Sequence, residues 1–91
     1  MTSAATLLPL LKLEIGITAT TFDARLTAYL ENAQAQIQRE GITLQSTTDD
    51  DWLTINYAAW TWRKRTTGEG MPRMLRYALN NRLFSEKAGA T

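Results

Sequence analysis

The side chains best suited to chemistry in this 91-residue sequence are carboxylates, because the chain contains no histidine and no cysteine. Asp49, Asp50 and Asp51 form a continuous acidic run, and Glu69 is a further candidate acid–base group. The absence of histidine removes the usual general base near neutral pH, and the absence of cysteine excludes thiol nucleophiles and disulfides. A carboxylate-only enzyme would still need an activated nucleophile and a pocket, and the sequence indicates neither. We therefore expect no enzyme activity and assign no catalytic residue.

The acidic run also has a structural explanation. Residues 46–51 are polar and indicate a loop that leads into a helix. Thr48 or Asp49 is the expected N-cap of that helix, and the aspartates complement the positive end of its dipole. Three adjacent carboxylates could hold a hard cation, but the run lacks the glycine and the distal glutamate of a calcium loop. We expect no metal and no cofactor.

The spacing of apolar residues predicts four helices, with no strand and no internal repeat. Their expected bounds are residues 3–15, 22–40, 51–66, and 71 or 72 to 85 or 87. Gly16 stops the first helix, and Pro9 inside it predicts either a kink or a start near Leu8. Residues 89–91 are expected to form a frayed end. The sequence thus predicts one all-α domain, residues 1–91, folded as a small bundle of about four helices.

The second predicted helix has two distinct faces. Thr20 or Thr21 is its expected N-cap. Its core stripe consists of apolar residues at helical spacing, namely Phe22, Leu26, Tyr29, Leu30, Ala33 and Ile37. Ala24, Ala28 and Ala35 line another side, where a second helix could approach closely. Simple helix propensity explains these alanines equally well.

The third predicted helix carries more apolar surface than one contact face requires. One edge consists of Trp52, Ile55, Ala59 and Trp62, and a second edge consists of Leu53, Tyr57 and Trp60. Asn56 and Arg63 lie between the two edges. Tryptophan, tyrosine and arginine are enriched at interface hot spots. We expect one edge to be core and the other to meet another subunit, with the candidate oligomer interface formed by Leu53, Tyr57, Trp60, Trp62 and Arg63. A domain that wraps this helix from both sides is the alternative.

The fourth predicted helix carries a basic face formed by Arg73, Arg76, Asn80 and Lys87. This face could approach a DNA backbone or an acidic partner, as could residues 63–65. Ordinary surface solvation is the alternative explanation. The sequence shows no helix-turn-helix spacing, and the net charge is only +1, so sequence-specific recognition is not expected.

Charge is distributed unevenly along the chain. Residues 1–51 carry three basic and seven acidic side chains, whereas residues 52–91 carry seven basic and two acidic side chains. The two halves could neutralise each other within one fold, or the acidic half of one copy could meet the basic half of the next. Both interpretations remain open at this point.

The leucine-rich start of the chain does not indicate a membrane protein. Pro9 and Lys12 interrupt the apolar stretch of residues 1–13, which is also far shorter than a membrane span. It lacks a basic leader and a small-residue cleavage site. We expect a soluble, cytoplasmic protein with no membrane partner.

Several segments stand in a distinctive order and spacing. They are residues 11–17 followed by the helix start at residues 22–26, residues 37–42, residues 57–60, and above all residues 68–82 with the sequence GEGMPRMLRYALNNR. Together they resemble the head–tail connector (adaptor) proteins of long-tailed phages and prophages. The resemblance covers about residues 8–87. No single segment is diagnostic by itself.

The resemblance implies a structural role in virion assembly and DNA packaging, without enzyme activity. Members of this family form a ring of identical subunits beneath the portal protein and join the head to the tail around the DNA channel. The implied partners are further copies of the chain, the portal, tail-completion or other head–tail joining proteins, and packaged DNA through non-specific contact. The implied location is the host cytoplasm during assembly and then the head–tail junction of the virion. A small nucleic-acid-associated or regulatory protein that uses the basic C-terminal helix is the alternative.

Overall fold

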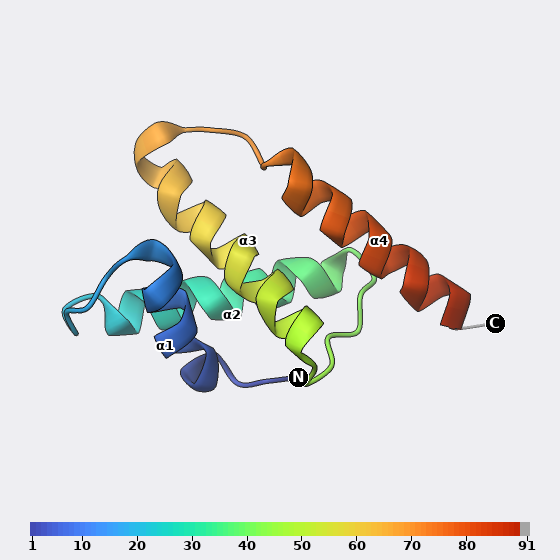
Figure 1. Ribbon diagram of the computed structural model, residues 1–91, viewed down its shortest axis with the longest axis horizontal. Coiled ribbons are helices and arrows are strands. Elements are labelled where there is room, and N and C mark those ends of the chain that lie inside the picture. The colour runs from blue at the N-terminus through green and yellow to red at the C-terminus, as the bar shows by residue number, and fades with distance from the viewer. Residues whose placement is uncertain (90–91) are drawn as a thin grey trace.

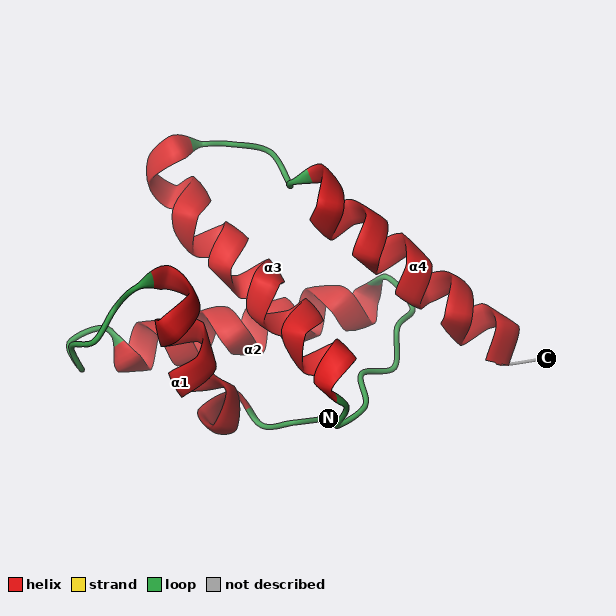
Figure 2. Cartoon of the chain, in the orientation of Figure 1, coloured by secondary structure: helices red, strands yellow, loops and turns green. Residues whose placement is uncertain are grey.

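The computed structural model describes residues 1–89, which form four α-helices and no strand (Figures 1 and 2). The helices are α1 (Ala4–Ile15), α2 (Asp23–Arg39), α3 (Thr48–Thr67) and α4 (Arg73–Gly89). The predicted all-α class and the number of helices are confirmed. Gly89 belongs to α4, and the remainder of the predicted frayed end, residues 90 and 91, lies outside the described residues.

The first three helices pack against one another, and α4 is attached mainly along α3. The contact between α3 and α4 is less extensive than the contacts among α1, α2 and α3. Figure 1 shows α4 returning alongside α3 and extending past the other helices toward the C-terminus. The molecule is accordingly elongated, with principal extents of 45 × 27 × 18 Å.

The first helix is held across its proline by packing. α1 begins at Ala4, and the hydroxyl of its N-cap Ser3 accepts a hydrogen bond from the backbone N–H of Thr6 at 3.3 Å. The helix continues through Pro9, so the alternative start near Leu8 is wrong. Leu7 and Leu11 flank the proline and are almost completely buried. Their burial compensates for the amide hydrogen bond that proline cannot make.

The starts of α2 and α3 differ from the predicted caps. No side chain caps α2, so the prediction of Thr20 or Thr21 is wrong. Phe22 precedes the helix and packs edge-on against Trp62, with ring centroids 5.6 Å apart, so a tertiary contact positions this start. The cap of α3 is Thr47, whose hydroxyl accepts from the backbone N–H of Asp50 at 3.3 Å. α3 therefore begins at Thr48, earlier than predicted.

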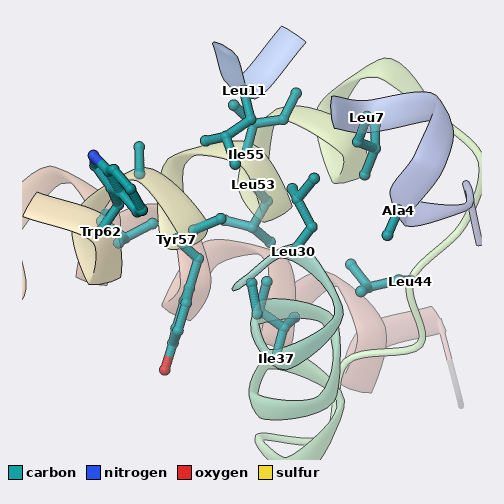
Figure 3. Close-up of a cluster of buried hydrophobic side chains, with 14 of the residues drawn as sticks. Ala4, Leu7, Leu11, Leu30, Ile37, Leu44, Leu53, Ile55, Tyr57 and Trp62 are labelled. Atoms are coloured by element: carbon teal, nitrogen blue, oxygen red, sulfur yellow. The ribbon is translucent and has the colours of Figure 1, made fainter. Parts of the chain in front are cut away.

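The core lies where α1, α2 and α3 meet. Figure 3 shows its side chains converging from these helices, and the largest fully buried apolar side chains that they contribute are Leu7, Leu11, Leu26, Leu30, Ile37 and Ile55. The segment after α2 adds the buried Ile42 and Leu44, and α4 adds Leu75 and Leu79.

Gly41 makes the turn from α2 into the segment that follows. Its φ of 102° lies in the region that favours glycine. An added Cβ there would also come within 3.3 Å of the Cδ1 atom of Leu83 in α4. Glycine at this position therefore permits both the turn and the approach of α4.

Candidate interaction surface

The second edge of α3 is enclosed within the chain itself. Leu53 and Tyr57 are buried, and Trp60 is half-buried. The indole N–H of Trp60 donates to the carbonyl oxygens of Gly70 at 3.1 Å and Glu69 at 3.3 Å, in the connection between α3 and α4. Much of the edge that we predicted to meet another subunit is therefore already buried within one chain.

Trp62 is also a core residue. Its ring makes edge-on contacts with Phe22 and Tyr29, each with centroids 5.6 Å apart, and Arg65 lies over it at 3.8 Å. Among the candidate interface residues, Arg63 alone is exposed, and its Nη2 lies 3.9 Å from the carboxylate of Glu14. α3 is therefore wrapped from both sides, as the alternative interpretation required.

The polar residues expected to mark the seam of α3 lie in a groove between α3 and α4. Asn56 lines two adjoining hollows of about 400 and about 290 Å³, and Ala78 of α4 lines both as well. Trp52, which we placed on the core edge, lines the larger hollow and is 41% exposed. The groove thus runs along one side of the contact between the two helices.

The acidic run contributes an ion pair rather than a reactive cluster. The carboxylate of Asp50 is buried and accepts from Nε of Arg82 at 2.8 Å, from Nη2 of Arg82 at 3.2 Å and from the backbone N–H of Gln45 at 2.7 Å. Burial opposes ionisation of Asp50, but these hydrogen bonds outweigh it and lower its pKa. Across residues 1–89, no group of three or more acidic side chains converges in a way that could hold a metal ion.

The predicted basic face of α4 is divided by an ion pair. Arg76 donates to both carboxylate oxygens of Glu40, at 2.9 and 3.0 Å, and to Oδ1 of Asn80 at 3.3 Å. The hydrogen bonds to Glu40 raise the pKa of Arg76. Arg73 and Lys87 lie exposed on either side of this pair along the helix. The structure therefore brings Arg76 and Asn80 together at the end of α2, and Arg73 and Lys87 remain separate surface cations.

Three ion pairs connect the acidic half of the chain to the basic half. They are Arg63 with Glu14, Arg76 with Glu40, and Arg82 with Asp50. Since each pair is formed within one molecule, the structure favours neutralisation inside the fold over a contact between copies. Arg82 also pairs with Glu86 one turn away.

Three strongly exposed apolar side chains are gathered on the outward face of α4. Met74, Tyr77 and Phe84 are 75, 52 and 77% exposed, respectively. Their spacing places them on one side of the helix, whereas Leu75 and Leu79 on the opposite side are buried. We name Met74, Tyr77 and Phe84 the α4 stripe. We did not predict this stripe from the sequence, because we considered only the leucines and the basic residues of this helix. The helical spacing of the stripe is nevertheless present in the sequence.

Comparisons with known proteins found no relative of this chain. A scan against protein-family models, a search of curated proteins and a search of solved structures each found no match. Within the part of the chain that is described, no helix has the length and apolar character needed to cross a membrane.

Proposed function

We propose that this chain is a structural subunit of a head–tail connector in a tailed phage or prophage. In this role, copies of the chain form a ring beneath the portal protein and join head to tail around the DNA channel. The proposal includes the portal, tail-completion proteins and further copies of the chain as partners, and it assigns no enzyme activity. The protein would be in the host cytoplasm during assembly and then at the head–tail junction.

The observation that carries the proposal is the exposure of the α4 stripe. Although α4 buries Leu75 and Leu79, it leaves two aromatic rings and a methionine largely exposed. Contiguous exposed apolar side chains of this kind mark protein interaction surfaces. The resemblance of residues 68–82 to connector proteins, which spans the start of this same helix, supports a connector as the kind of assembly.

The proposal is tested by mixing the purified chain with the portal ring encoded by the same genome. We expect the chain to co-sediment with the portal and to add ring-shaped density beneath it in electron micrographs. Tyr77→Ser combined with Phe84→Ser should abolish this binding. Leu13→Ser is the matched control, because Leu13 is an exposed apolar residue on α1 at 80% exposure. Failure of the unaltered chain to bind the portal would contradict the proposed function.

The alternative function uses the exposed cations Arg73 and Lys87 to bind nucleic acid. The pairing of Arg76 with Glu40 leaves fewer cations to contact phosphates than the sequence indicated. Binding of the isolated chain to duplex DNA at physiological salt, with a steep loss as salt increases, would favour this alternative over the connector.

A further inference from the structure

The outward face of α4 has the spacing of a helix-pairing seam. Met74, Tyr77, Asn81, Phe84 and Ala88 follow one another at intervals of three, four, three and four residues. This is the a/d repeat by which one helix packs lengthwise on another. Asn81 is the polar residue at its centre, and a single asparagine at an a position sets the register of coiled coils. The face therefore favours another helix as its partner over a flat surface.

The outward face of α2 has the same spacing in the opposite direction. Its residues Ala24, Ala28, Glu31, Ala35 and Gln38 follow at intervals of four, three, four and three, and all five are exposed. Read from C-terminus to N-terminus, these intervals match those of α4. Each face covers fourteen residue steps, which corresponds to about 21 Å of helix. The two faces are therefore equal in length and opposite in direction.

We propose that α4 of one copy of the chain packs antiparallel along the outward face of α2 of the next copy, with Asn81 opposite Glu31. In this register Tyr77 faces Ala35 and Phe84 faces Ala28, so that each large ring of α4 meets a small residue. The amide of Asn81 donates to the carboxylate of Glu31 at the centre of the contact. This pairing identifies the surfaces through which neighbouring subunits of the ring contact each other, and it rests on the proposed connector function.

The flanking charges select the antiparallel direction. Arg73 and Lys87 flank the α4 face on one side, and Arg25 and Arg39 flank the α2 face on one side. A parallel pairing would place these two sets of cations against each other. In the antiparallel pairing, Arg25 of one copy lies near Ser85 of the next copy, on the side of α4 that borders the groove between α3 and α4. Asp49 lines the groove with Ser85, so an exposed arginine meets an exposed aspartate there.

A hollow of about 210 Å³ on α2 is lined by Arg25, Ala28, Tyr29 and Asn32. Of these residues, only Ala28 belongs to the α2 face. The hollow therefore borders the proposed contact on the side that carries Arg25. Because the α4 face and the α2 face are different surfaces, each copy contacts one neighbour through its α4 face and the other neighbour through its α2 face. Such heterologous contacts produce rings when the rotation closes.

The chain has no cysteine, so introduced cysteines report the pairing directly. Ala28→Cys and Ser85→Cys are placed on separate chains that differ in mass, and the chains are mixed and oxidised both free and bound to the portal ring. In the proposed register Ala28 lies level with Phe84, and therefore beside Ser85. Both residues are small and exposed. We expect a disulfide-linked heterodimer, and a ladder of higher oligomers when both substitutions are in one chain.

The matched control pairs Ala28→Cys with Ala78→Cys. Ala78 lies on the same side of α4 as Ser85, seven residues earlier, and it would be level with Ala28 only in the parallel register. We expect at least tenfold less cross-linking for this control. Preferential linking to position 78, a dominant Ser85→Cys homodimer, or linking no greater than in denaturant would each overturn the proposed pairing.

The two proposals fail separately in this experiment. If the cysteine variants bind the portal without forming the 28–85 link, the helix pairing is wrong and the connector function stands. If they form the link without binding the portal, self-association stands and the connector function is wrong.

Discussion

α3 and α4 are both rich in large apolar side chains, but the fold treats them differently. Trp62 of α3 is 7% exposed, whereas Phe84 of α4 is 77% exposed. α3 runs through the middle of the molecule, with α1 and α2 on one side and α4 on the other. α4 has a neighbour only on its Leu75 and Leu79 side. Aromatic content therefore does not decide which side chains stay exposed; the number of sides on which neighbours cover a helix does.

The difference between α3 and α4 is tested most directly by removing one aromatic ring from each helix. Trp62→Ala should lower the free energy of unfolding by about 3–5 kcal/mol, because it leaves a cavity between Phe22 and Tyr29. Phe84→Ala should change it by less than about 0.5 kcal/mol, since its ring touches mostly solvent. Urea unfolding followed by circular dichroism measures both values. Similar losses for the two variants would show that α4 is covered in the free chain.

A second prediction concerns the ion pair that ties α4 to the start of α3. Arg82→Met leaves the buried carboxylate of Asp50 without its main partner and should cost about 2–3 kcal/mol, reduced from the fully buried case because Arg82 is 21% exposed. Arg73→Met, which removes an exposed cation from the same helix, is the control and should cost less than about 0.5 kcal/mol. Amide hydrogen exchange should show faster opening of α4 in the first variant only. Unchanged exchange in α4 would contradict the anchoring role.

The same ion pair predicts a dependence of stability on pH. The pKa of Asp50 is lower in the folded state than its ordinary value. Its contribution to stability is therefore complete above that ordinary value and is lost as the pH falls through the folded-state pKa. Unfolding measured between about pH 5 and pH 2 should show this loss, and Asp50→Asn should flatten the acid limb of the curve. An identical acid limb in the variant would rule out Asp50 as its source.

The smallest effect should come from the hydrogen bond that closes α4 over α3. Trp60→Phe keeps most of the ring but removes the indole donor to the carbonyls of Glu69 and Gly70, and it should cost about 1 kcal/mol. Trp52→Phe makes the same change at a tryptophan that is 41% exposed and should cost less than about 0.5 kcal/mol. Equal costs would mean that the bond does not hold the connection.

Helix class, number and order could be predicted because they depend on local spacing. Of the predicted core stripe of α2, Leu26, Leu30, Ala33 and Ile37 are buried and Tyr29 is partly buried, whereas Phe22 precedes the helix and is 39% exposed. Gly16 ends α1 in the left-handed conformation, as predicted. The start of α2 could not be predicted from its threonines, because the packing of Phe22 on Trp62 competes with capping. Of the candidate interface residues, Leu53, Tyr57 and Trp62 are buried. Their burial could not be predicted either, because it depends on tertiary packing.

By itself, therefore, the amino-acid sequence determined that the chain is helical, roughly where its helices lie, and that α3 carries an excess of apolar side chains. The spacing of the exposed residues of α4 is also present in the sequence, although we did not predict that stripe. Packing decided which of these apolar surfaces is buried. The connection at residues 68–72 closes over Trp60, whose indole donates to its carbonyls, and α4 returns alongside α3 (Figure 1). Local periodicity does not encode this long-range arrangement. As a result the most exposed large apolar side chains of these two helices lie on α4 rather than on the tryptophan-rich α3, since each helix can bury only the sides that neighbours reach.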